Sequence, residues 1–166
     1  MTGKPRRFYV VTPDNSAAAG FENTEGAEAA AVAYGDGAHV VDTEAMPYQP
    51  SVRVVEGGEI AYVGFGMFDS RKGAGGGLIE AAKKGFPPLV RAYLAKGADP
   101  NSTDPHGGTA LHWAVAAGNE EAVRMILAEG ADPNLPDGKG APPLKLAEER
   151  NKPKIIKLLK DAGAHS

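Results

Sequence analysis

An internal repeat of 33 residues constrains the fold of this sequence more than any other feature. The pentapeptide Gly97–Asn101 recurs as Gly130–Asn134, and a shortened copy, Gly163–Ala164, follows after the same interval. The same step joins equivalent apolar positions, among them Leu78, Leu111 and Leu144. Each copy on its own would leave an apolar face exposed to water, so the copies are expected to stack and bury these faces between them.

Each copy has the pattern of two short helices. In the middle copy the first helix is expected over Thr109–Ala117 and the second over Glu120–Ala128, with Gly118 as the break between them. Prolines stand one period to either side of Glu120, in the first helical turn, where a missing N–H is tolerated: Pro87 and Pro153. The sequence therefore predicts three helix pairs over residues 78–164.

The segment Thr109–Ala114 reads TALHWA and is similar to the T-P-L-H-x-A signature of the ankyrin-repeat family. The resemblance covers about residues 71–166, and the copies that flank the middle one are degenerate, as the end units of a stack are. It implies an all-α ankyrin-repeat solenoid of three repeats over residues 78–166, which binds another protein and is not an enzyme. For His112 it implies a hydrogen-bonding role between repeats.

The resemblance also implies where a partner binds. In the ankyrin-repeat family the turn tips and first helices line a concave face, which corresponds here to Lys72, Glu80, Lys83, Lys84, Pro105, His106, Trp113, Lys139, Leu146, Glu149 and Arg150. This face is mostly basic, so the expected partner is a protein with an acidic surface. Trp113 is either an aromatic anchor for the partner or a side chain partly buried between repeats.

Residues 1–68 do not repeat and predict a small α+β module. Strands are expected at 7–12, 38–42, 51–55 and 60–64, with a helix that is capped by Asn23 or Thr24 and runs to Tyr34, in the order β-α-β-β-β. Pro13–Phe21 is expected to be a loop, and Glu56–Glu59 the turn of a hairpin.

Residues 69–77 are expected to link the module to the repeats. Apolar side chains gather at this junction, at Phe65, Met67 and Phe68. A flexible tether would expose them, so the module is predicted to pack on the first repeat and cap the stack.

Composition and motifs exclude several kinds of site. Without cysteine the chain has neither disulfides nor thiolate ligands, which favours a reducing, cytoplasmic setting. No apolar run is long enough to span a membrane, and a net charge of −3 gives no general attraction to nucleic acid. The glycine-rich stretch 71–77 lacks the residues of a phosphate loop, and the four histidines lack the spacing of metal ligands: His39, His106, His112 and His165. No cofactor, metal site or catalytic residue is predicted.

These observations favour a non-catalytic interaction protein that modulates or inhibits its partner, as an inhibitor, immunity factor or adaptor. A second hypothesis places an enzyme or a small-ligand site in residues 1–68, with the repeats serving for targeting. Four polar side chains could meet there, if the fold brings them together: Tyr9, Asp42, Tyr48 and Arg53.

Overall fold

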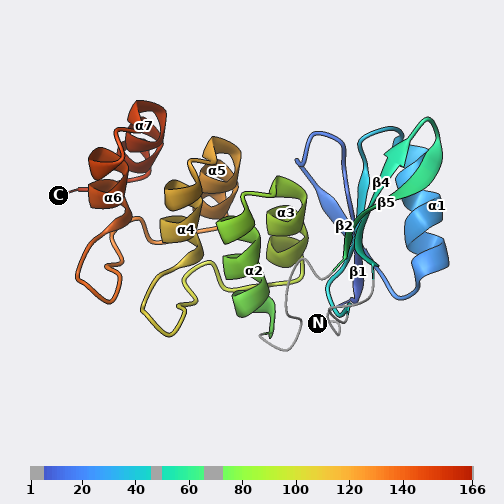
Figure 1. The fold of residues 1–166 in the computed structure, drawn as a ribbon, viewed down its shortest axis with the longest axis horizontal. Coiled ribbons are helices and arrows are strands. Elements are labelled where there is room, and N and C mark those ends of the chain that lie inside the picture. Colours follow the sequence, from blue (N-terminus) through green and yellow to red (C-terminus); the bar gives the residue numbers. More distant parts are fainter. Residues whose placement is uncertain (1–5, 46–49, 66–72, 166) are drawn as a thin grey trace.

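The computed structural model describes residues 6–45, 50–65 and 73–165. A β-sheet with one helix lies at one end of an elongated molecule, and three pairs of helices continue from it in a row (Figure 1). The elements are β1 (Phe8–Val11), β2 (Ala18–Phe21), α1 (Thr24–Tyr34), β3 (His39–Asp42), β4 (Pro50–Glu56), β5 (Glu59–Phe65), α2 (Gly73–Lys84), α3 (Pro87–Ala95), α4 (Ala110–Ala117), α5 (Glu120–Ala128), α6 (Pro143–Glu149) and α7 (Pro153–Asp161). The predicted fold class, an α+β module followed by a helical stack of three repeats, is confirmed.

The sheet is antiparallel, with the strand order β2-β1-β3-β4-β5. The predicted element order β-α-β-β-β is wrong because it lacks β2, which lies inside the segment expected to be a loop. The small residues of β2 have little strand propensity of their own. Pairing with β1 along its whole length, from Phe8 opposite Phe21 to Val11 opposite Ala18, makes this segment a strand. The predicted hairpin turn is confirmed, since Glu56 pairs with Glu59.

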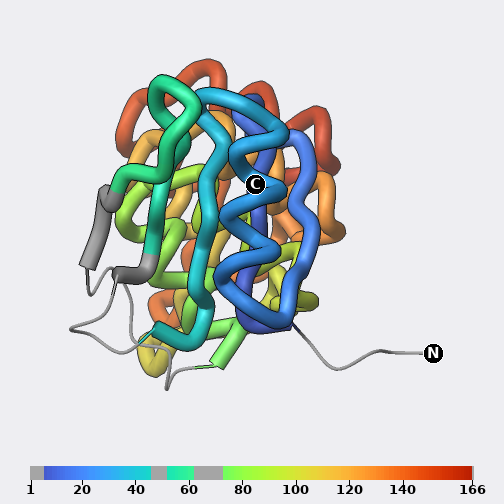
Figure 2. The backbone as a smooth tube through the Cα atoms, turned by 90° about the vertical axis from the view of Figure 1, so that its right-hand side faces the viewer, coloured from blue at the N-terminus to red at the C-terminus, as the bar shows by residue number. Residues whose placement is uncertain are grey.

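Helix α1 starts and ends where its capping residues predict, and it covers one face of the sheet. Asn23 Oδ1 accepts a hydrogen bond from the backbone N–H of Gly26 at 2.8 Å, and Gly35 follows the last turn with a φ of 91°. Figure 2 shows the helix in front of the sheet, running along the strands. Its buried alanines pack against apolar side chains of the sheet, in a core formed by Phe8, Val10, Ala27, Ala31, Ala38, Val40 and Val55.

The opposite face of the sheet packs on the first helix pair. Side chains alternate between the two faces of a strand, so β1 directs Phe8 and Val10 toward α1 and its other two residues toward the repeats. Buried residues of this second face share one core with residues of the first repeat, among them Tyr9, Val11, Val41, Val52, Leu78 and Leu89. The predicted packing of the module on the first repeat is therefore confirmed.

The repeat region forms three helix pairs, α2–α3, α4–α5 and α6–α7, as the 33-residue period predicts. The equivalent leucines Leu78, Leu111 and Leu144 are at most 2% exposed. Stacking thus buries the position that the period marks in every copy.

The predicted linker over residues 69–77 is wrong for residues 73–77, which form the first turns of α2, whereas residues 69–72 lie outside the described ranges. Glycines lower intrinsic helix stability, so this turn depends on tertiary packing. A Cβ on Gly77 would collide with the ring of Tyr93 in α3. Gly77 therefore allows α2 and α3 to approach closely.

Candidate functional site

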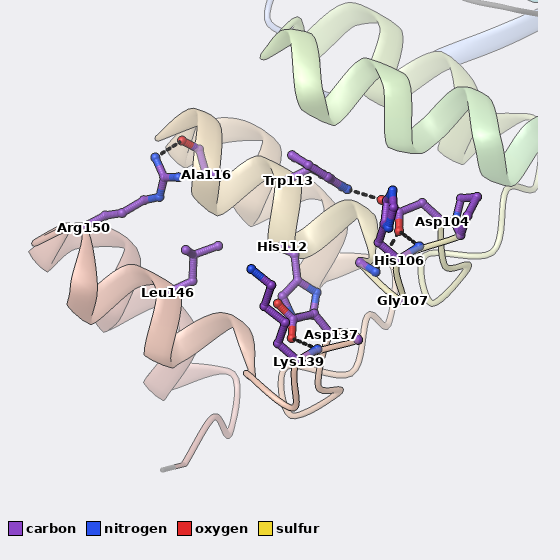
Figure 3. A pocket seen from close by; sticks show the side chains of 13 residues that line it. Asp104, His106, Gly107, His112, Trp113, Ala116, Asp137, Lys139, Leu146 and Arg150 are labelled. Atoms are coloured by element: carbon purple, nitrogen blue, oxygen red, sulfur yellow. Dashed lines mark hydrogen bonds between the residues drawn. The ribbon is translucent and has the colours of Figure 1, made fainter.

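A groove with a volume of about 770 Å³ extends across the second and third repeats. It lies between the facing sides of α4 and α6 and the loops that precede them, residues 104–108 and 137–141, called finger loops below (Figure 3). The groove is lined by Asp104, Pro105, His106, Gly107, Gly108, His112, Trp113, Ala116, Asp137, Gly138, Lys139, Leu146 and Arg150.

Each finger loop is closed by the aspartate at its first position. Asp104 Oδ1 accepts hydrogen bonds from the backbone N–H groups two and four residues later, at 2.9 and 3.0 Å. Asp137 Oδ1 accepts the equivalent pair at 2.9 and 3.0 Å. Aspartate commonly stabilises turns in this way. These hydrogen bonds fix the backbone from which the side chains of the loops extend along the groove wall.

The two finger loops are also joined to each other. The Gly138 N–H donates a hydrogen bond to the carbonyl oxygen of His106 at 2.9 Å. A Cβ on Gly107 would lie 2.7 Å from the Gly138 nitrogen, and Gly107 has a φ of 78°, which glycine adopts readily. Glycines at both points thus let the loops pack into one continuous wall.

His112 ties the second repeat to the third beneath this wall. Its ring is buried, and Nδ1 accepts a hydrogen bond from the Thr109 N–H at 3.2 Å. Nε2 lies 2.9 Å from the Ala141 carbonyl oxygen, which can only accept, so Nε2 carries the proton. This contact confirms the hydrogen bond between repeats that the ankyrin resemblance implies for His112.

Trp113 is half-buried on the groove wall, where α4 faces α2. Its Nε1–H donates a hydrogen bond to Asp104 Oδ2 at 2.8 Å, and Lys83 Nζ lies 4.5 Å from the centre of the ring. The indole is therefore held by the protein on two sides. It keeps ring surface in the groove, but its hydrogen-bond donor is already used.

Both aspartates of the finger loops are ionised at neutral pH. Burial alone would raise the pKa of Asp104, but hydrogen bonds from Trp113 and from two backbone N–H groups, together with the charge of Lys83, outweigh burial and lower it. The pKa of Asp137 is also lowered, chiefly by the backbone N–H of Ala141. These negative charges thus have partners inside the loops.

The cations of the groove are more available than its carboxylates. Arg150 Nη1 donates to the Ala116 carbonyl oxygen at 3.3 Å, which holds the guanidinium beside α4 while the side chain stays exposed. Lys139 is exposed, and its ammonium group makes no hydrogen bond to any residue that the structure describes. Both groups can therefore reach a bound molecule.

The structure brings six of the eleven predicted partner-binding residues together in the groove: Pro105, His106, Trp113, Lys139, Leu146 and Arg150. Glu80 and Lys83 lie beside it on α2 and form an ion pair at 3.7 Å. Lys84 and Glu149 are exposed near the ends of α2 and α6 and do not line the groove. Lys72 lies outside the described residues.

Sequence reasoning missed the two aspartates that shape the groove. The signal was present, because Asp104 and Asp137 are one 33-residue step apart and each is followed three residues later by glycine. Ala116 was missed as well, since a small side chain on a helix carries no signal of its own.

The polar residues proposed for a site in residues 1–68 do not converge. Tyr9 is buried on the face of the sheet that meets the repeats. Arg53 pairs with Glu28 of α1 at 3.2 Å, on the opposite face, and Asp42 is buried and pairs with Arg7 at 2.8 Å. Tyr48 lies outside the described ranges.

Two other features are absent from the residues that the structure describes. In these ranges no three histidine, aspartate or glutamate side chains gather in a way that could hold a metal ion. No helix among them combines the length and the apolar character needed to cross a membrane.

Comparison with known protein families identifies the repeats. No curated protein matches the chain significantly. The family model for ankyrin repeats, in three copies, matches residues 78–166. This is more than half of the chain, and it coincides with the three stacked helix pairs and with the groove between their finger loops. The chain therefore belongs to the ankyrin-repeat family, and its repeats are a protein–protein interaction module.

Proposed function

We propose that the protein binds a partner protein in this groove and modulates or inhibits it without catalysing a reaction, as an inhibitor, immunity factor or adaptor. The observation that carries the proposal is the construction of the groove. Internal hydrogen bonds hold the finger loops and helices of successive repeats in place. These elements present to the groove the ammonium group of Lys139, the side chain of Leu146 and the exposed guanidinium group of Arg150. Binding to a preformed surface costs less ordering entropy than binding to a flexible one.

The proposed partner has an acidic surface. Lys139 and Arg150 project into the groove, and Lys83 and Lys84 lie on the neighbouring helix α2. Cations at the rim of an interface chiefly speed the encounter with a surface of opposite charge. The absence of cysteine suits a partner met in the cytoplasm.

Affinity capture with the full chain, followed by mass spectrometry, identifies the partner, and calorimetry then measures its affinity. The test compares two double variants with the same change in charge. The groove variant carries Lys139→Glu and Arg150→Glu, and the control variant carries Lys157→Glu and Lys160→Glu on α7, where both lysines are exposed.

The groove variant should bind the captured partner about tenfold or more weakly, whereas the control variant should bind it nearly as the unmodified chain does. Equal affinity of the groove variant and the unmodified chain would place the binding surface elsewhere. The full chain is used throughout, because the sheet and the repeats share one core.

A further inference from the structure

We propose that the groove holds a short segment of the partner, in which an apolar side chain is flanked by carboxylates. The apolar side chain contacts Trp113 and Leu146, and the flanking carboxylates pair with Arg150 at one end of the groove and with Lys139 at the other (Figure 3). This inference rests on the proposed function and specifies the part of the partner that is bound.

The volume of the groove suits a short segment of the partner. The groove offers about 770 Å³. A few residues of a peptide chain fit this space, which lies in the range of sites that enclose small ligands.

The walls of the groove provide an apolar surface between two repeats. Trp113 and Leu146 occupy equivalent positions, one 33-residue step apart, on α4 and α6. Ala116 lies one turn further along α4 and also lines the groove. Since the Trp113 N–H is bonded to Asp104, the ring is left to make apolar contacts with a bound side chain.

The formal charges of the lining side chains cancel, since two aspartates stand against Lys139 and Arg150. The charge that the groove prefers in a ligand therefore depends on which of these side chains are free to bind it. The carboxylates of Asp104 and Asp137 accept hydrogen bonds within the finger loops. A basic segment would have to compete with these bonds.

An acidic segment meets exposed donors instead. Arg150 uses one of its five N–H groups on the Ala116 carbonyl oxygen, and the guanidinium group can bind a carboxylate in a bidentate way. Lys139 adds a second cation, on the finger loop of the third repeat. The groove therefore favours carboxylates beside the apolar side chain.

A display library of short random linear peptides, selected on the immobilised full chain, tests this inference. Peptides are counter-selected on the groove variant, so that those which bind elsewhere are removed. The enriched sequences should combine an apolar residue with flanking aspartate or glutamate. Enrichment of neutral or basic sequences, or no enrichment at all, would overturn the inference.

The fluorescence of Trp113 provides an independent measurement of peptide binding, because Trp113 is the only tryptophan of the chain and lines the groove. A synthetic copy of the most enriched peptide should shift its fluorescence emission in a saturable way. For the groove variant, the peptide concentration at half-saturation should be about tenfold higher. The unmodified chain should show the same increase with a peptide in which glutamine replaces glutamate. The α7 control variant should bind like the unmodified chain.

The two proposals fail in different ways. If the captured partner loses affinity for the groove variant but no acidic peptide binds, the groove recognises a folded surface, so the proposed function stands and the peptide inference falls. If the groove variant keeps full affinity for the partner, the proposed function itself falls.

Discussion

Arg91 of the first repeat donates a hydrogen bond from Nε to the backbone carbonyl oxygen of Asn15, in the β1–β2 loop, at 2.9 Å. The same loop reaches the second repeat, because Asn15 Nδ2 donates to Glu121 Oε1 at 3.1 Å. Asn15 has a φ of 57°, a conformation that asparagine tolerates better than most residues. The N-terminal module therefore contacts two repeats and fixes their spacing on the side of the second helices.

The first prediction follows from this contact. Arg91→Ala should lower the free energy of unfolding by about 1–2 kcal/mol, because it removes a charge-assisted hydrogen bond and an ion pair with Glu129. Arg124→Ala is the matched control, since Arg124 is exposed at the equivalent position of the next repeat. Urea denaturation measures both, and equal losses would show that the Asn15 contact contributes nothing to stability.

The second prediction concerns the core of the stack. Leu111 is fully buried in the middle repeat, so Leu111→Ala should cost about 2–5 kcal/mol through lost burial and a cavity. Leu135→Ala, in the partly exposed loop that follows α5, should cost clearly less. Thermal melts followed by circular dichroism compare the two variants. An unchanged melting temperature for Leu111→Ala would show that Leu111 is not part of the core.

The third prediction tests the bond between Asp104 and Trp113. In Asp104→Asn the one remaining oxygen still accepts from the backbone N–H groups, and the amide nitrogen faces the indole N–H as a second donor. Loss of the bond to the indole should cost about 1–2 kcal/mol. The emission of Trp113 should change. Asp137→Asn provides the control, because the equivalent position in the third repeat holds Leu146 and no tryptophan. An identical spectrum in both variants would contradict the assigned contact.

The fourth prediction is a dependence of stability on pH. The pKa of His39 is lowered, mainly by burial, and its ring lies edge-on to Phe86 with centroids 5.5 Å apart. Below pH about 6.5 the unfolded chain takes up a proton at this residue before the folded chain does. The free energy of unfolding should therefore fall as the pH drops from 6.5 toward the lowered pKa.

His39→Leu should flatten this part of the pH profile, whereas His165→Gln, at an exposed position, should leave it unchanged. Denaturant titrations at a series of pH values provide the measurement. A profile for His39→Leu that runs parallel to that of the unmodified chain would show that His39 is not the titrating group.

The parts of the fold that the sequence predicts well are those in which one signal repeats. Leu78, Leu111 and Leu144 face the same kind of neighbour, so periodicity alone predicts their burial. The strand β2 and the first turns of α2 were not predicted, because small residues and glycines have weak propensities. Their conformations come from pairing with β1 and from packing against Tyr93.

In the candidate site, too, some features follow from the sequence and others only from the tertiary structure. The sequence by itself determined the repeat and which positions of successive copies are equivalent, since these depend on spacing along the chain. Only the tertiary structure decided which charges are available: Asp104 is bonded to Trp113, and Arg150 reaches the Ala116 carbonyl oxygen of the previous repeat. Hydrogen bonds between side chains depend on distances across the stack, and a period along the chain does not specify them.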